Sequence, residues 1–437
     1  MQSLWRLVLS LAGLMGARLS GAAFGFLSQV VLARTFLPHD VGTIFLGMSL
    51  TAFVSLLITG GYHSIALTYL ARFQAFGRSR LVEAFLTAAR RDMYALTALF
   101  LLLAPAAFVL PLEDGMAKAV LYGVLAAIPV AAIRLNNSAA NAQRRFALSY
   151  MPDFVVRPGL LLAFLVVMIL LGLPRTIDAV LIATVVISLL VAVGQAIIMG
   201  SDNAFGRQSG DAPQRDLRTF YRRRAAAMLM VTIVAGATAD LVVLLGGLFL
   251  PPDQVAVLGV AIRVAALVGF FSTASQQFAL RDLATSMATN RAATSGILWR
   301  TNLIALATML GTTVLAIIFG PLVLALFGPE YVAGYWPLVI FLFSQSVRVM
   351  GGMNAHLLSL GGHQVRSARL CLMAVVMLVA VAAVLTPAWG LVGIASALLV
   401  AEIFWAVSLG MLTQRLEGRR GDIFQGLATH RIFTAVR

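Results

Sequence analysis

Several charged side chains of this sequence lie inside stretches that are otherwise apolar. A charged side chain at the centre of a membrane-spanning helix costs roughly 2.5–3.5 kcal/mol, so it faces a cavity or a partner rather than lipid. An arginine in such a place suits a phosphate group, because its planar guanidinium can bind two oxygens at once. The residues concerned are Arg18, Arg134, Arg157, Arg263 and Arg348, together with the acids Asp240 and Glu402.

Two interpretations of these arginines are open. Arg18, Arg263 and Arg348 lie deepest in their apolar stretches, whereas Arg134 and Arg157 lie nearer an end and can extend toward the interface. Either the arginines line a cationic cavity that binds an anionic group, or they pair with acids and backbone carbonyls and hold helices together. Because the deep arginines outnumber the two acids, we expect at least one of them in an anion site. The predicted substrate-binding set is Arg18, Arg263, Arg348 and Arg134.

The remaining polar residues of the apolar stretches have similar alternatives. Asp240 and Glu402 are candidates to couple transport to a proton or sodium gradient, or they neutralise an arginine. Gln276, Gln277 and Asn141 are candidates to contact a sugar, or they form hydrogen bonds between helices.

The sequence carries no recognisable motif for catalysis, cofactor binding or metal binding. Cys371 is the single cysteine, so neither a disulfide nor a cysteine-based metal site can form within one chain. Patterns such as HExxH, GxSxG and the phosphate-binding glycine loops do not occur in a usable context. We therefore expect a protein that is not an enzyme and that needs neither a cofactor nor a metal.

Composition indicates the solvent of this chain. Of its 437 residues, 60% are hydrophobic and 11% are charged, whereas soluble proteins carry about 25% charged residues. Mean hydropathy is +0.94, which predicts an integral membrane protein. The net charge is +15, but basic and aromatic residues are not interleaved as on a nucleic-acid-binding surface, so we expect no nucleic acid partner.

Apolar stretches of about 20 residues predict an all-α protein with twelve membrane-spanning helices. Gly60-Gly61 and Pro129 are candidate hinges inside these helices. Gly21 and Gly25 form a small-xxx-small pattern that favours close helix packing. The predicted spans are 8–33, 41–70, 93–112, 117–139, 153–173, 177–200, 225–250, 254–281, 299–319, 335–358, 369–387 and 389–413.

The distribution of basic residues predicts the orientation. With the N-terminus inside, the outer connections carry only Arg34, Lys118 and Arg175, and the other basic residues outside the spans lie on the inner side. Cytoplasmic loops carry this excess of Lys and Arg. We therefore expect a multi-pass protein of a bacterial inner membrane with both termini cytoplasmic.

The two halves of the chain repeat several landmarks. Residues 35–42 read TFLPHDVG and residues 248–255 read LFLPPDQV, and Phe36 matches Phe249 at an offset of 213 residues. Arg134 and Arg348 recur at nearly the same offset. The repetition predicts two parallel six-helix repeats, as in some transporters. The expected domains are a six-helix bundle over 1–200, a cytoplasmic linker over 201–224, a second bundle over 225–413 and a basic tail over 414–437.

The N-terminal run from Ala17 to Gly61 resembles the polysaccharide-transport flippases of the MOP superfamily, also called the Wzx type. The family pattern there is a first helix that ends in an Ala-Arg-Leu-Gly-Pro-like turn, followed by an acidic residue and Gly-x-Tyr. Ala33-Arg34, Pro38 and Gly42 match that pattern, Asp40 replaces the usual glutamate, and Ile44 stands where a tyrosine is common. The motifs are turns and small residues, so they fix no binding residue.

The resemblance implies a transporter that flips an undecaprenyl-diphosphate-linked oligosaccharide from the inner to the outer leaflet by alternating access, for O-antigen or exopolysaccharide synthesis. The substrate is its first partner. Membrane lipids, a polysaccharide polymerase and chain-length proteins are further expected partners. A multidrug antiporter of the MATE type is an alternative, although an arginine-rich interior suits cationic drugs poorly. The lipid II flippases have fourteen helices, so the predicted twelve argues against that branch.

A membrane polysaccharide polymerase or glycosyltransferase is a less favoured alternative. Such enzymes usually carry a sizeable outer loop or domain with catalytic residues. The outer connections between the predicted spans are all short, which argues against this class.

Overall fold

The computed structural model describes residues 2–109, 113–201, 215–289, 291–418 and 420–424, and the described residues contain helices and no strand. The prediction of an all-α fold is confirmed. The chain forms two compact units, Met1–Leu244 (unit 1) and Leu245–Arg437 (unit 2). The predicted division into two six-helix bundles, a linker and a basic tail stays a prediction.

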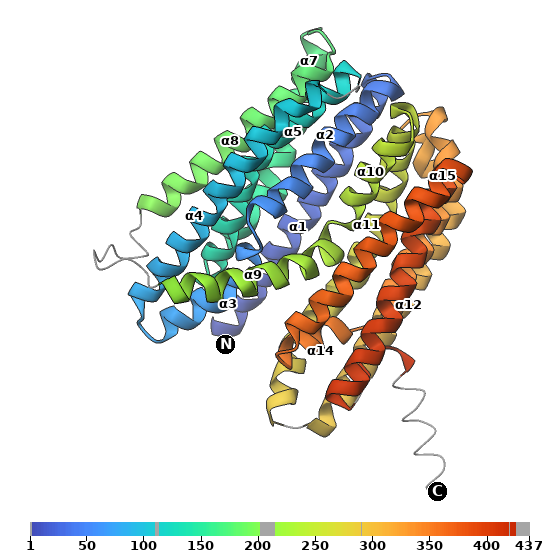
Figure 1. The fold of residues 1–437 in the computed structure, drawn as a ribbon. Helices are drawn as coiled ribbons and strands as arrows, with labels where there is room; N and C mark the ends of the chain where they lie inside the picture. Colours follow the sequence, from blue (N-terminus) through green and yellow to red (C-terminus); the bar gives the residue numbers. More distant parts are fainter. Residues whose placement is uncertain (1, 110–112, 202–214, 290, 419, 425–437) are drawn as a thin grey trace, which may run out of the picture. The chain divides into compact units, whose positions relative to one another are not determined.

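Unit 1 holds the helices of the first half and the beginning of the second. Its helices are α1 (Gln2–Thr35), α2 (Pro38–Ile58), α3 (Tyr62–Ala75), α4 (Ser79–Leu103), η1 (Ala104–Phe108), α5 (Asp114–Ala142), α6 (Phe146–Met151), the π-helix η2 (Pro152–Val156), α7 (Arg157–Leu170), α8 (Ile177–Ser201), α9 (Arg215–Gly236) and most of α10 (Thr238–Phe249) (Figure 1).

Unit 2 is built mainly from long helices. They are α11 (Pro252–Thr289), α12 (Arg291–Ala325), η3 (Pro329–Gly334), α13 (Tyr335–Met350), α14 (Asn354–Leu360) and α15 (Gln364–Glu417). α15 covers the two predicted spans 369–387 and 389–413, and Gly390 interrupts it with φ 56° and ψ −130°. The break therefore falls three residues after Pro387, where the sequence suggested that the first of these spans ends.

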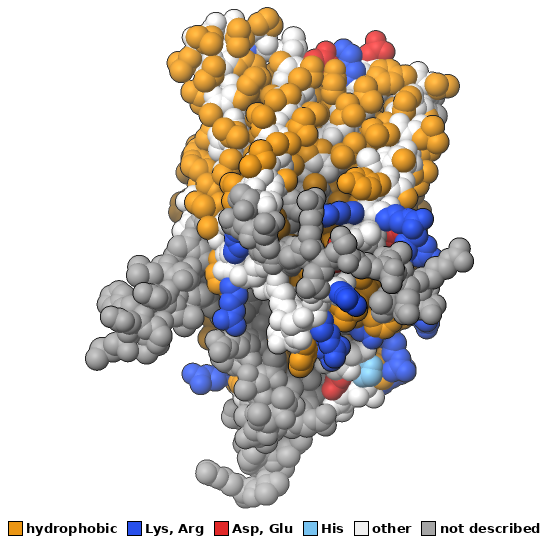
Figure 2. Space-filling model, turned by 90° about the vertical axis from the view of Figure 1, so that its left-hand side faces the viewer, with side chains coloured by type: hydrophobic (Ala, Val, Ile, Leu, Met, Phe, Trp, Pro, Cys, Tyr) orange, Lys and Arg blue, Asp and Glu red, His pale blue; other side chains and the backbone are white. Residues whose placement is uncertain are grey.

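Among the described residues, nine helices are long and apolar enough to cross a membrane, or ten if α9 and α10 form one bent span. Large hydrophobic side chains such as Leu102, Leu170 and Ile197 are exposed on them, as expected where lipid replaces water. On the face shown in Figure 2, hydrophobic side chains cover one end, and Lys and Arg side chains gather toward the other. The chain is thus a multi-pass membrane protein, while the count of twelve spans and the orientation stay predictions.

The repeated FLP turn starts a helix in both halves. Pro38, the proline of the first turn, is the first residue of α2, after Leu37 in an extended conformation. Pro251, the proline of the second turn, directly precedes α11, which begins at Pro252. Proline suits the first helical position because its fixed φ fits the helix and its missing N–H would have no partner there. A proline therefore occupies the first helical position in each unit, but in unit 2 the repeated turn ends one residue earlier relative to the helix.

Two breaks divide spans of unit 1. Between α2 and α3 the backbone turns at Gly60 (φ 54°) and Gly61 (φ 83°), so one of the two predicted hinge positions is a real break. A Cβ atom on Gly61 would also lie 2.0 Å from the carbonyl oxygen of Ala225 in α9. The second break, at Ala237, bends α9 and α10 by 78°. Pro129, the other predicted hinge position, lies inside a continuous α5.

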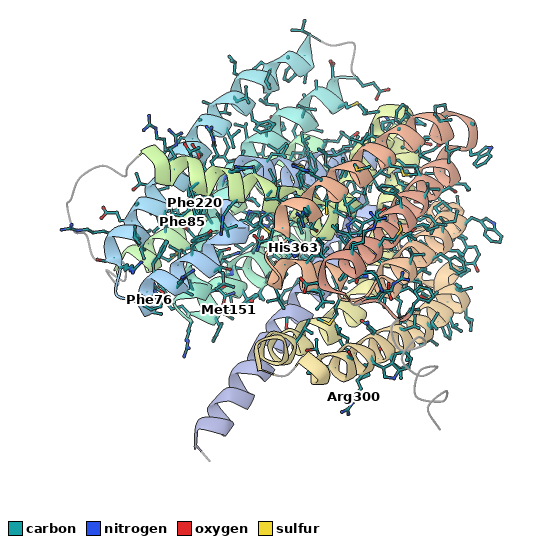
Figure 3. All side chains as sticks on the ribbon, turned by 60° about the horizontal axis from the view of Figure 1, so that its bottom comes forward. Phe76, Phe85, Met151, Phe220, Arg300 and His363 are labelled. Atoms are coloured by element: carbon teal, nitrogen blue, oxygen red, sulfur yellow. The ribbon has the colours of Figure 1, made fainter. Side chains whose placement is uncertain are left out.

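Aromatic side chains hold α3, α4 and α9 together within unit 1. The ring of Tyr221 lies 5.4 Å from that of Tyr69 and 5.2 Å from that of Phe85, and Phe220 packs against Tyr221 (Figure 3). Asp92 is buried beside this cluster, where it accepts hydrogen bonds from Tyr62 (2.7 Å) and Arg218. These contacts explain why α9, although it begins the second half of the sequence, packs with unit 1.

Candidate functional site

A half-buried arginine takes part in a polar network in unit 1. The Nε atom of Arg134, in α5, donates to Ser55 Oγ in α2 over 3.0 Å. The Ser55 hydroxyl donates in turn to the carbonyl oxygen of Ala52 (2.8 Å), so its oxygen is the acceptor for Arg134. Ser55 is fully buried. The sequence analysis described Arg134 as able to extend toward the interface. In the structure, its side chain contacts Ser55 inside unit 1 instead.

The charges around Arg134 do not contact it directly. Asp153, Arg157 and Asp240 lie close enough to act on its guanidinium electrostatically. Asp153 and Arg157 form an ion pair with 3.3 Å between Oδ1 and Nη2. Among the described residues, the hydrogen-bond partner of Arg134 is the neutral Ser55, which uses one of the five N–H donors of a guanidinium. An anion-binding role for Arg134 stays a prediction.

A cavity of about 200 Å³ lies beside this network, between α1, α2, η2, α7 and α8. Asp153 and Arg157 contribute their charged side chains to its wall. Polar side chains from α1, α2 and α8 complete the polar part of the lining, namely Ser28, Gln29, Thr51 and Thr184. Gly25 lines the same cavity, while Gly21, one turn earlier, packs against η2.

His63 follows the α2–α3 break and is satisfied by neighbouring hydroxyls. Its Nδ1 lies 2.7 Å from Thr59 Oγ1, and its Nε2 lies 3.1 Å from Ser64 Oγ. Thr59 already donates to the carbonyl oxygen of Leu56 (2.7 Å), so it accepts from His63 and the proton of the neutral ring sits on Nδ1. Ser64 Oγ also lies 2.8 Å from Thr232 Oγ1 in α9, and Thr232 donates to the carbonyl oxygen of Met228, so the one Ser64 proton serves either Thr232 or His63.

In unit 2, Arg348 and Glu402 form a direct ion pair. Arg348 Nη2 donates to Glu402 Oε1, and the guanidinium lies 5.6 Å from the ring centroid of Trp405. Glu402 is 3% exposed, so it cannot exchange this partner for water. The sequence analysis offered two roles for Glu402, coupling to an ion gradient or neutralising an arginine. The structure shows Glu402 paired with an arginine.

Of the remaining predicted site residues, the structure describes the side chains of Asn141 and Arg263. Asn141 donates to the Tyr150 hydroxyl over 3.3 Å, which is a bond between α5 and α6. Arg263 lies half-buried in α11. The side chains of Arg18, Gln276 and Gln277 lie outside the described residues. In the described part of the chain, no group of three or more His, Cys, Asp or Glu residues could hold a metal ion.

The sequence analysis gave no role to Asp153 or Ser55. Asp153 stands four residues before Arg157, a spacing that places both on one helix face and was visible in the sequence. Ser55 gave no signal, because its contact with Arg134 depends on how α2 packs against α5.

No protein-family model matches the chain, and no curated protein matches it. Solved structures do match. An inward-facing multidrug resistance MATE family transporter of the MOP superfamily is 14% identical, covering 91% of this chain and 95% of that chain, with a TM-score of 0.71. The lipid II flippase MurJ in an inward closed conformation is 12% identical over 92% of this chain and 87% of that chain, also with a TM-score of 0.71.

A third match is a MOP superfamily transporter from Pyrococcus furiosus, for which a reversed polarity of the binding pocket suggests a different function. It is 13% identical, covers 91% of this chain and 95% of that chain, and has a TM-score of 0.52. The chain therefore has the fold of MOP superfamily transporters. At these identities the likeness concerns the fold alone.

Proposed function

We propose that this protein is a transporter that flips a lipid-diphosphate-linked oligosaccharide from the inner to the outer leaflet of a bacterial inner membrane. The substrate class follows from the resemblance of the N-terminal run to oligosaccharide flippases, and the fold supports it because a lipid II flippase shares that fold. The surface glycan that such a substrate serves is an O-antigen or an exopolysaccharide.

The observation that carries the proposal is Arg134. A guanidinium inside a membrane protein is costly, and it is retained where it has a function or a partner. Arg348 has the carboxylate of Glu402 as its partner, whereas Arg134 has the neutral hydroxyl of Ser55. Arg134 therefore keeps donors for a diphosphate, with Arg18 and Arg263 as further proposed contacts.

A multidrug antiporter is the second candidate, because MATE transporters share the fold. Asp153 and Asp240 are the carboxylates near Arg134, and either of them is a possible site for a cation. The ion pair of Asp153 with Arg157 counts against this candidate, since a carboxylate held by a guanidinium is a poor host for a second cation.

The test is a lipid extract from cells that lack this protein, analysed by mass spectrometry. The proposal predicts that a lipid-diphosphate oligosaccharide accumulates and that the matching surface polysaccharide is lost. A complete surface glycan with no trapped intermediate, together with increased sensitivity to cationic drugs, would favour the antiporter. A single repeat unit trapped on the outer leaflet would point to a polymerase.

A further inference from the structure

A second, larger cavity lies on the outside of unit 1 and is separate from the polar network. It is a groove of about 650 Å³ between the segment from Arg145 to Leu160 and the second half of α8. This volume lies in the range of ligand pockets. α7 and α8 run side by side in unit 1 (Figure 1), and the absent side chain of Gly194 on α8 leaves open space between them.

The groove is apolar and open to the surroundings. Its wall includes Met151 (47% exposed; Figure 3), Leu160 (41%), Leu190 (62%) and Ile198 (50%). These side chains belong to two helices that are apolar enough to span a membrane. Hydrocarbon, not water, therefore surrounds the groove, and a lipid chain is the molecule that fits it.

Polar groups are confined to two places in the groove. Arg145 lines it half-buried, and Arg144, its exposed neighbour, adds a second positive charge. Gln195 is 2% exposed and also lines the groove. The Gln195 amide bonds to Asn137 (2.7 Å) and to the carbonyl of Leu148 (3.1 Å), and one of its two polar atoms has no hydrogen-bond partner in the described part of the chain.

We propose that this groove binds one anionic phospholipid, with an acyl chain along the hydrophobic wall. Arg145 contacts the phosphate at one end of the groove. Two arginines at one end select a negatively charged headgroup over a zwitterionic one. An oligosaccharide would require several polar contacts, and the groove offers only Arg145 and Gln195, so an ordinary membrane lipid is the occupant. The inference does not depend on the transported substrate.

Two leucine substitutions on α8 provide a matched test. A side chain added at Gly194 or at Gly200 enters open space in both cases, but only Gly194 lines the groove. The proteins are reconstituted in nanodiscs of phosphatidylethanolamine and phosphatidylglycerol, and the retained lipid is counted by native mass spectrometry. We expect the wild type and Gly200→Leu to retain phosphatidylglycerol and Gly194→Leu to lose it.

A charge variant tests the headgroup. Arg145→Gln should lower the retention of phosphatidylglycerol by about tenfold, the effect of one lost charge-assisted hydrogen bond, and should reduce the preference for phosphatidylglycerol over phosphatidylethanolamine. A photo-reactive residue at Leu190 should cross-link to phosphatidylglycerol more than one at Val193. Both positions are exposed on α8, and only Leu190 lines the groove. This comparison stands even if Gly194→Leu fails to fold.

Several outcomes would overturn the proposal. They are equal retention by the wild type and both leucine variants, no retained phospholipid in the wild type, equal cross-linking at Leu190 and Val193, or a lipid-diphosphate oligosaccharide retained in place of the phospholipid.

Discussion

Arg134 and Arg348 occupy corresponding positions of the two sequence halves, yet their surroundings differ. The sequence treats them as one repeated landmark, although Arg134 lies nearer the end of its predicted span and Arg348 lies deeper. In unit 2, the guanidinium of Arg348 is neutralised by the buried carboxylate of Glu402. In unit 1, the guanidinium of Arg134 contacts the hydroxyl of Ser55, and its nearest carboxylates act from farther away.

The difference separates two roles that are indistinguishable in the sequence. An arginine paired with a buried acid fixes helices and has little capacity for a ligand. An arginine hydrogen-bonded to a hydroxyl keeps its charge and most of its donors. We therefore expect substitutions at Arg134 to affect transport, and substitutions at Arg348 and Glu402 to affect stability.

The largest effect is expected at Arg134. Arg134→Gln keeps a hydrogen-bond donor for Ser55 but removes the positive charge. Export of the glycan should fall by at least about tenfold, because a charge-assisted bond to the phosphate is lost. Arg134→Lys should keep part of the activity, since the positive charge remains but the planar guanidinium, which can bind two phosphate oxygens at once, is lost. Surface glycan per molecule of membrane-inserted protein is the quantity to measure, and full activity of Arg134→Gln would remove this arginine from the site.

The ion pair of unit 2 should show the opposite pattern. Arg348→Met leaves Glu402 buried without its partner and should destabilise the protein by about 3–5 kcal/mol. The double variant Arg348→Met, Glu402→Leu should recover most of the lost stability, because no buried charge remains. Thermal unfolding of the purified protein measures both. A double variant that is stable but transports nothing would assign the pair to transport and break the comparison.

The close contact of α1 with η2 gives a smaller, purely structural effect. A Cβ atom on Gly21 would lie 2.0 Å from the carbonyl oxygen of Phe154, whereas one on Gly25 meets open space. Gly21→Ala should therefore cost about 1–3 kcal/mol of stability, as overpacking typically does. Gly25→Ala is the matched control on the same helix. Equal melting temperatures for the two variants would show that α1 does not approach η2 this closely.

The smallest structural effect is expected at Asp240. Asp240→Asn changes little volume, so the protein should unfold at nearly the wild-type temperature. If Asp240 couples transport to an ion gradient, export by the variant should no longer respond when the proton or sodium gradient is collapsed. If collapse of the gradient reduces export by the variant as much as export by the wild type, Asp240 does not couple transport to that gradient.

Much of the fold could be predicted because membrane helices are specified locally. About 20 apolar residues are long enough to make a span, and a proline is the first residue of both α2 and α11. The break at Gly60-Gly61 was also visible, since two adjacent glycines favour a turn. Pro129 carried a similar signal and did not break α5, because surrounding helices can maintain a helix through a proline.

The candidate site was predictable only in part. The charged residues stood out, because charge is rare in apolar stretches. Their partners did not, since the choice between Ser55 and a carboxylate for Arg134 is made by the packing of α2 against α5. The same limit applies to Arg348, whose partner Glu402 lies in a helix 54 residues away.

The most direct test of the account uses purified protein in liposomes that carry a lipid-diphosphate oligosaccharide labelled on its sugar. The fraction of label that becomes accessible on the opposite leaflet is measured for the wild type, Arg134→Gln and the double variant of Arg348 and Glu402. The account predicts translocation by the wild type and the double variant, and none above empty liposomes by Arg134→Gln. Translocation by Arg134→Gln at the wild-type rate would contradict it.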